Sequence, residues 1–115
     1  MNRGNSVYLR HIYDSICRIE QYTKDMVFDS FIDNGLVQAA VIRELEIIGE
    51  ATKRISIDIR DKYPEIPWKV MAGTRDKLIH HYFGVDIQVV WDTVDKAIPQ
   101  LKAKIERLFE REGIG

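Results

Sequence analysis

Arg75 and His80 are the side chains whose types and spacing suit chemistry on a phosphodiester, and Tyr82 follows two residues later. An arginine can hold a phosphate through two parallel hydrogen bonds, and a histidine exchanges protons near neutral pH. Cleaving RNA by attack of the 2′-hydroxyl on the adjacent phosphorus needs a base, an acid and a cation for the developing charge. Arg75 suits the cation, and His80 suits the base or the acid.

A single amphipathic helix over 71–84 is predicted to carry these residues. Pro67 suits the first turn, Gly84 suits the left-handed C-terminal position, and Asp86 suits the N-cap of the next helix. At about 100° per residue, Arg75 falls near the middle of an apolar stripe, and His80 lies roughly 140° away at its edge. The other members of the stripe are Trp68, Met71, Ala72, Leu78, Ile79, Tyr82 and Phe83.

A guanidinium in an apolar stripe needs an anionic partner, because it cannot lose its proton and its desolvation is costly. The preceding long helix offers Glu46 or Glu50 as that carboxylate. The alternative for both is a solvated helix face with ordinary charge pairs. Gly73 lies below His80, with Asp76 beside it. Because glycine costs a helix about 1 kcal/mol relative to alanine, Gly73 indicates the close approach of a ligand or another backbone.

Apolar residues recur at helical spacing along the rest of the chain, and no segment reads as a strand. The first helix is expected to be capped by Asn5 or Ser6, and 27–35 is expected to be an aromatic, turn-like stretch. Further helices are expected over 36–55, over 56–63 and from Asp86 onward, where Pro99 should kink or split the last one. These elements predict an all-α, up-and-down bundle of four or five helices.

Length and composition are those of one ordinary globular domain, spanning residues 1–115. The formal net charge is −1, so any contact with nucleic acid must come from a local basic patch. A solvated charged face is the alternative for its candidate members, which are Lys53, Arg54, Lys69, Lys77 and His81. The single cysteine, Cys17, excludes an internal disulfide, and no apolar signal region or membrane-spanning run is present. A cytoplasmic protein is expected.

Other chemistries find little support in the sequence. Asp76 and His80 lie one turn apart and could supply two metal ligands, but His81 diverges by about 100° and no cysteine pair assists them. No metal site is therefore expected. Glycine-rich phosphate loops and nucleophile elbows are absent, so no cofactor is expected either.

The chain resembles the HepT-like members of the HEPN superfamily, which carry the motif R-x4-H-x-Y. Arg75, His80 and Tyr82 occupy the three motif positions. The resemblance extends over nearly the whole chain. Its other segments are 40–51 (AVIRELEIIGEA), 64–68 (PEIPW), 71–73 (MAG), 81–86 (HYFGVD) and 90–94 (VWDTV).

This resemblance implies a HEPN-like helical fold and a metal-independent ribonuclease toxin that uses Arg75 and His80. It also implies a dimer in which paired motifs line a cleft. The antitoxin of such proteins is a minimal, MntA-like nucleotidyltransferase, which can transfer AMP to the tyrosine at the position of Tyr82.

Two hypotheses follow from the sequence. In the first, the protein is a homodimeric endoribonuclease toxin whose antitoxin is a nucleotidyltransferase. In the second, the same dimer binds nucleotide or RNA without cutting it and scaffolds the nucleotidyltransferase. A purely structural adaptor would leave Arg75 unexplained in its apolar stripe.

Overall fold

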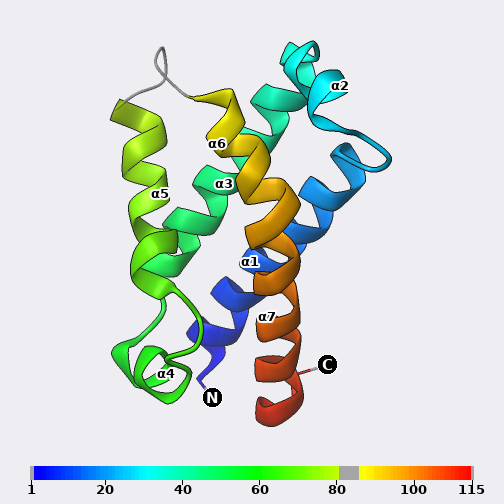
Figure 1. Cartoon of the computed structure of the whole chain (residues 1–115). Helices are drawn as coiled ribbons and strands as arrows, with labels where there is room; N and C mark the ends of the chain where they lie inside the picture. The colour runs from blue at the N-terminus through cyan, green and yellow to red at the C-terminus, as the bar shows by residue number, and fades with distance from the viewer. Residues whose placement is uncertain (1, 81–85, 115) are drawn as a thin grey trace.

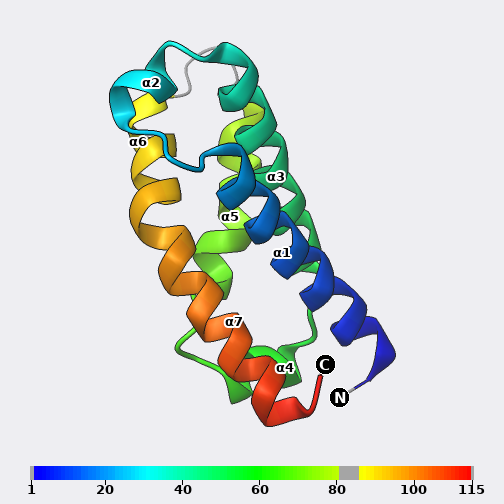
Figure 2. The same cartoon turned by 90° about the vertical axis from the view of Figure 1, so that its right-hand side faces the viewer.

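The computed structural model describes residues 2–80 and 86–114, and of residues 75–80 it describes only the backbone. Figures 1 and 2 show an all-helical bundle in which the described residues form no strand. Its elements are α1 (Arg3–Tyr22), α2 (Phe28–Ile32), α3 (Gly35–Lys53), α4 (Ile57–Lys62), α5 (Trp68–His80), α6 (Ile87–Asp92), the π-helical turn η2 (Thr93–Ala97) and α7 (Ile98–Glu112). The predicted all-α class is confirmed.

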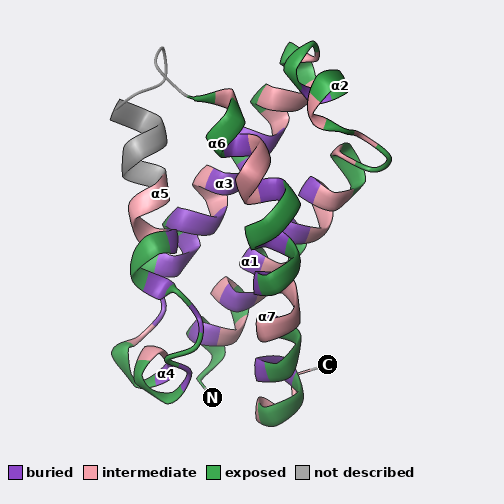
Figure 3. Ribbon diagram, viewed as in Figure 1, coloured by how far each residue is buried: buried purple, intermediate pink, exposed green. Residues whose placement is uncertain are grey.

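Helix α3 is the centre of the bundle, because α1 packs along one of its flanks and α5 along the other. Its N-terminus is capped by the Asn34 side chain, which accepts from the Val37 N–H at 3.0 Å. Buried residues lie on both flanks of α3 (Figure 3). The wide apolar face of the segment 36–55 predicts a helix that is covered on more than one side. In the structure, α1 and α5 both pack on α3.

The first helix begins three residues earlier than its pattern predicts. Asn2 is the N-cap, and its side chain accepts from the Asn5 N–H at 2.8 Å. Asn5 is buried and bonds instead to Ser56, which precedes α4: the Asn5 Nδ2 donates to Ser56 Oγ at 2.8 Å, and the Ser56 N–H donates to Asn5 Oδ1 at 3.0 Å. The expected cap at Asn5 or Ser6 is thus wrong, because a long-range partner claims the Asn5 amide.

The expected turn-like stretch 27–35 contains a short helix, α2. Ser30 Oγ accepts from the Val27 N–H at 3.0 Å and donates to the Val27 carbonyl at 2.9 Å, which closes the first turn. Phe31 is fully buried and its ring centroid lies 5.2 Å from that of Trp91. The Phe31–Trp91 contact holds α2 against α6, and this tertiary packing outweighs the turn signal in the sequence.

The final helical column contains the π-helical turn η2 just before Pro99, where the sequence predicts a kink or a split. Asp86 caps α6 through its side chain, which accepts from the Gln88 N–H at 2.9 Å. At the end of η2, the Ile98 N–H bonds to the Thr93 carbonyl, five residues back. Proline offers no N–H and crowds the preceding turn, and a wider π-helical turn accommodates it without ending the helix.

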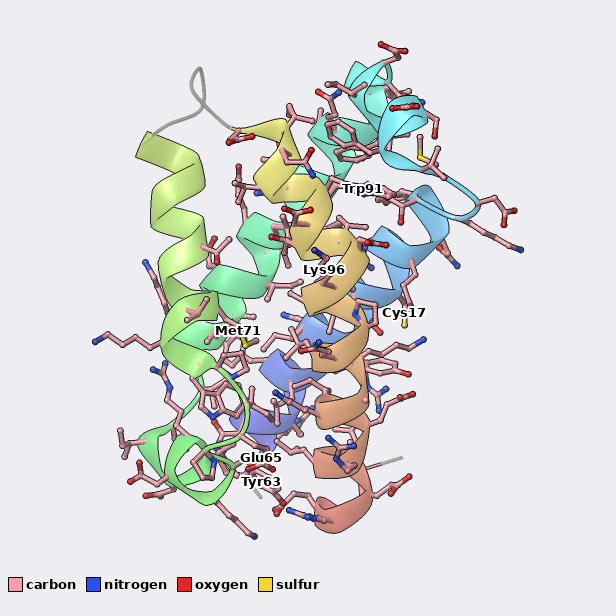
Figure 4. The ribbon with its side chains drawn as sticks, viewed as in Figure 1. Cys17, Tyr63, Glu65, Met71, Trp91 and Lys96 are labelled. Carbon is pink, nitrogen blue, oxygen red and sulfur yellow. The ribbon has the colours of Figure 1, made fainter. Side chains whose placement is uncertain are left out.

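The end of α7 is fastened to the connection between α4 and α5. Tyr63, fully buried, donates its hydroxyl hydrogen to Glu112 Oε2, and Lys62 Nζ lies 2.7 Å from the same oxygen. Trp68 Nε1 donates to the Tyr63 carbonyl at 3.0 Å, which ties the start of α5 to this cluster. Figure 4 shows Tyr63 and Glu65 at this end of the molecule. Burial, and then the bond to Glu112, raise the pKa of Tyr63 to about 12.

We expect the Tyr63 hydroxyl to make stability depend on alkaline pH. In the unfolded chain a tyrosine ionises near its ordinary pKa of 10.0, whereas folded Tyr63 keeps its proton to about 12. Its contribution is therefore fully present below pH 10 and is lost as the pH rises toward 12. Tyr63→Phe should cost about 1 kcal/mol at pH 7 and make the fall of Tm between these pH values less steep.

Thermal melts followed by circular dichroism at several pH values measure this slope. Tyr22→Phe, at an exposed tyrosine of α1, is the matched control and should keep the wild-type slope. An unchanged slope in Tyr63→Phe would show that the Tyr63–Glu112 bond does not set the alkaline limit.

Candidate active site

Helix α5 carries the catalytic candidates, and its N-terminal half is firmly placed. Trp68 and Met71 are buried, and the Met71 N–H bonds to the Pro67 carbonyl at 3.0 Å. Position 75 follows Met71 by about one helical turn, so the backbone places it on the same side of α5. Position 80 lies about 18 Å along the helix axis from Trp68. The side chains of Arg75, Asp76, Lys77 and His80 lie outside the described part of the chain, as do His81 and Tyr82.

An apolar cavity of about 100 Å³ shows which parts of α3 and α5 lie side by side. Leu45 and Ile48 of α3 border it together with Met71 and Thr74 of α5. The opposite wall comes from the final helical column and includes Thr93, Ala97, Ile98 and Leu101. Met71 is labelled on α5 in Figure 4. Since α3 and α5 run in opposite directions (Figure 1), the part of α3 before Leu45 lies beside the part of α5 after Thr74.

The two candidate carboxylates differ in their position relative to Arg75. Glu46 is next to Leu45, its side chain is 22% exposed, and it forms a 3.6 Å ion pair with Arg43. Glu50 is exposed and lies four residues, or about 6 Å of helix axis, farther than Glu46 from the level of Arg75. Glu50 also borders a different groove, formed between α1 and α3. Glu46 is therefore the better placed of the two.

The most buried carboxylate of α3 is Glu44, which the sequence reasoning did not single out. Its Oε1 accepts from Arg18 Nε of α1 at 2.7 Å, and this bond raises the pKa of Arg18 above its ordinary value. Arg18 also donates to Ser15 Oγ at 3.3 Å. The signal was present in the sequence, because Glu44 lies three residues after Val41 and four before Ile48, on the main apolar stripe. A charge there requires a partner.

The basic candidates that the structure describes lie at the end of α3 and at the start of α5. Arg54 ends α3 on the side of α1, with its guanidinium carbon 5.7 Å from the centroid of the Tyr8 ring. Lys53 is the exposed last residue of α3, and Lys69 is exposed in the first turn of α5. The side chain of Lys77 and the whole of His81 lie outside the described residues.

Gly73 lies in the second turn of α5, and a Cβ added there would meet nothing within 4 Å among the described residues. None of the described residues therefore occupies the space beside it. Within the described residues, no group of three or more His, Cys, Asp or Glu side chains could hold a metal ion. The pair of Asp76 and His80 is not covered by that finding. None of the described helices is long and apolar enough to span a membrane.

Comparison with known protein families shows which family the chain belongs to. The family model described as "Ribonuclease HepT-like" matches residues 12–108, which include all of α5. The chain belongs to the HepT-like ribonuclease family.

Curated relatives agree with this membership. A Thermococcus cleftensis protein named "Probable ribonuclease HepT" is 51% identical over 108 residues, covering 94% of this chain and 98% of the relative. A Methanocaldococcus jannaschii protein named "Putative RNase" is 48% identical over 108 residues, covering 94% and 93%. Another from that organism, "Gamma-glutamylcyclotransferase and putative RNase", is 48% identical over 96% of this chain but only 50% of its own length. No solved structure matches.

Membership in the HepT-like family supports a ribonuclease activity in general terms. The three motif residues of the sequence fall within the matched region, and the backbone of the first two lies on α5. The R-x4-H-x-Y motif is the sequence signal that identifies these catalytic candidates. The motif identifies neither the carboxylate partner of Arg75 nor the path that an RNA strand would take.

Proposed function

We propose that this HepT-like protein is a metal-independent endoribonuclease and the toxin of a toxin–antitoxin pair. The observation that supports the proposal most is the family match over 12–108, which encloses Arg75 and His80 on a helix packed along α3. Arg75 would hold the scissile phosphate. His80 would transfer protons as the ribose 2′-oxygen bonds to phosphorus and the bond from phosphorus to the 5′-oxygen breaks.

This reaction leaves one RNA fragment with a 2′,3′-cyclic phosphate and the other with a 5′-hydroxyl. The direct test is to incubate the purified chain with single-stranded RNA in excess EDTA and to identify the new ends by mass spectrometry. Cyclic phosphate ends formed in EDTA support the proposal. RNA that binds but stays intact, with or without divalent metal, favours the second hypothesis, a binding module that scaffolds a nucleotidyltransferase.

A two-chain active site accounts for the need for both an acid and a base. Each chain has a single Arg75/His80 pair, so a two-fold axis beside α5 would bring two histidines to one phosphate. The space beside Gly73, which none of the described residues fills, suits the approach of a second α5. We therefore propose a homodimer whose α5 helices face each other.

Gly73→Leu tests this arrangement, because nothing within the described chain opposes a larger side chain there. The variant should melt at or slightly above the wild-type temperature, since leucine favours helix over glycine by up to about 1 kcal/mol. RNA cleavage should fall at least roughly tenfold as the helices are pushed apart. Gly35→Leu, at an equally open helical position, is the matched control. Light scattering that shows an active monomer at micromolar concentration would overturn the dimer.

Regulation is proposed to act through Tyr82, whose hydroxyl would accept AMP from a nucleotidyltransferase antitoxin. Tyr82 follows Arg75 by seven residues, which is about 10 Å along a continuing helix. A phosphate attached there would compete with RNA for the Arg75 guanidinium. After coexpression with the antitoxin, mass spectrometry should find AMP on Tyr82, and Tyr82→Phe should keep much of its cleavage activity yet escape neutralisation. Equal neutralisation of Tyr82→Phe would point to steric blocking instead.

A further inference from the structure

A second groove lies between α1 and α3, on the side of α3 that faces away from α5. It has a volume of about 180 Å³. On a helical projection its residue Arg54 lies about 180° from Leu45, which borders the cavity beside α5. The groove is lined by Tyr8, His11, Ile47, Glu50, Ala51 and Arg54.

The walls of this groove are held in place by interactions above and below it. The Asn5–Ser56 hydrogen bonds close one end of the α1–α3 contact, and the Arg18–Glu44 ion pair closes the other. Both helices are therefore fixed relative to each other along the length of the groove. The groove is therefore a surface between two helices that are tied together at both ends of their contact.

The groove combines aromatic, cationic and anionic groups. The Arg54 guanidinium lies over the Tyr8 ring, and the His11 ring meets the Tyr8 ring edge-on, with centroids 5.8 Å apart and planes at 86°. A guanidinium held over an aromatic ring still has several N–H groups, which can bind an anion. Glu50 adds a carboxylate to the same lining.

This mixture identifies the ligand chemistry. A bare anion or an acidic side chain would gain from Arg54 alone and would make no use of the Tyr8 and His11 rings. A nucleotide matches both kinds of group, because its phosphate can bind Arg54 while a ribose hydroxyl or a base amino group can donate to a Glu50 oxygen. Its base would contact the rings of Tyr8 and His11 and the apolar Ile47, as bases do on aromatic platforms. The volume is below the roughly 300–1,000 Å³ of pockets that enclose drug-sized ligands, so the groove has room for part of one nucleotide, such as its base, with the remainder at the surface.

We propose that the α1–α3 groove binds a nucleoside monophosphate unit, at a site separate from the catalytic motif. The unit comes either from a strand of RNA or from a free nucleotide. Only the RNA source rests on the proposed ribonuclease function. In that case the groove is a second anchor that holds the substrate away from the cleaved bond.

The experiment measures equilibrium binding by the full-length His80→Ala chain, which keeps RNA intact. The probes are a fluorescein-labelled single-stranded RNA octamer, 5′-AMP and an oligoglutamate peptide. Arg54→Gln is introduced into this background, and Arg107→Gln, at an exposed arginine of α7, is the matched control for the loss of one positive charge. The His11 ring signals in NMR spectra report on occupation of the groove.

We expect Arg54→Gln to raise the Kd of the nucleotide-containing probe roughly tenfold, as the loss of one charged hydrogen-bonding contact predicts, and Arg107→Gln to change it less than about twofold. Shifts of the His11 signals with AMP assign the groove to a free nucleotide, and shifts with RNA alone assign it to a strand.

Unchanged binding in Arg54→Gln, or binding of oligoglutamate without either nucleotide probe, would overturn the proposal. Because cleavage is assayed separately with the wild-type chain, Arg54-dependent binding beside an absence of cleavage would overturn the ribonuclease and not the groove.

Discussion

Replacing His80 with alanine should remove RNA cleavage and leave the fold intact. A positioned acid or base contributes roughly 10²–10⁴-fold to rate, and a dimer loses both copies of the imidazole at once. The helical projection puts position 80 at the edge of the apolar stripe, so its truncation should move Tm by no more than about 1–2 °C. Single-turnover cleavage of labelled RNA measures the first effect, and thermal melts measure the second.

The matched control for His80→Ala is Gln21→Ala, at an exposed residue of α1 outside both the motif and the α1–α3 groove. It should keep the wild-type kcat and KM. If His80→Ala cleaved RNA at the wild-type rate, His80 could not be the proton-transferring group. The same pair of variants tests toxicity in cells, since growth arrest by the chain alone should require His80 and not Gln21.

Arg75→Ala should reduce both cleavage and stability, which separates it from His80→Ala. The backbone places position 75 on the same side of α5 as the buried Trp68 and Met71, where a guanidinium requires an anionic partner. We propose Glu46 as that partner, because it is half-buried and level with this part of α5. Removing the arginine would leave the Glu46 carboxylate with only its 3.6 Å ion pair to the exposed Arg43, at a cost of about 1–3 kcal/mol.

A double-mutant cycle measures the proposed contact. Arg75→Ala, Glu46→Gln and the combined variant should show a coupling free energy of about 0.5–3 kcal/mol in denaturant unfolding. Glu50→Gln replaces Glu46→Gln in the control cycle and should show no coupling with Arg75→Ala. Additive effects in the first cycle would exclude Glu46 as the partner, and a wild-type Tm in Arg75→Ala would show that Arg75 is not desolvated.

The sequence by itself determined the all-α class, the long helices and the helix that carries positions 75 and 80. Asp86 and Pro99 act through their own backbone neighbourhood, so the Asp86 cap and an irregularity of the last helix near Pro99 could be predicted from local chemistry. The R-x4-H-x-Y spacing placed Arg75 and His80 on one helix, because helical periodicity depends only on position along the chain.

The tertiary structure decided which helix faces meet. Asn5 looked like a local cap, yet it bonds to Ser56, 51 residues away. Arg54 is a basic-patch candidate by its charge alone, and the tertiary structure places its guanidinium over the Tyr8 ring of α1. Periodicity shows which residues share one face of a helix. It does not show which other helix packs on that face. That choice depends on the relative positions of α1, α3 and α5, and long-range packing sets these positions.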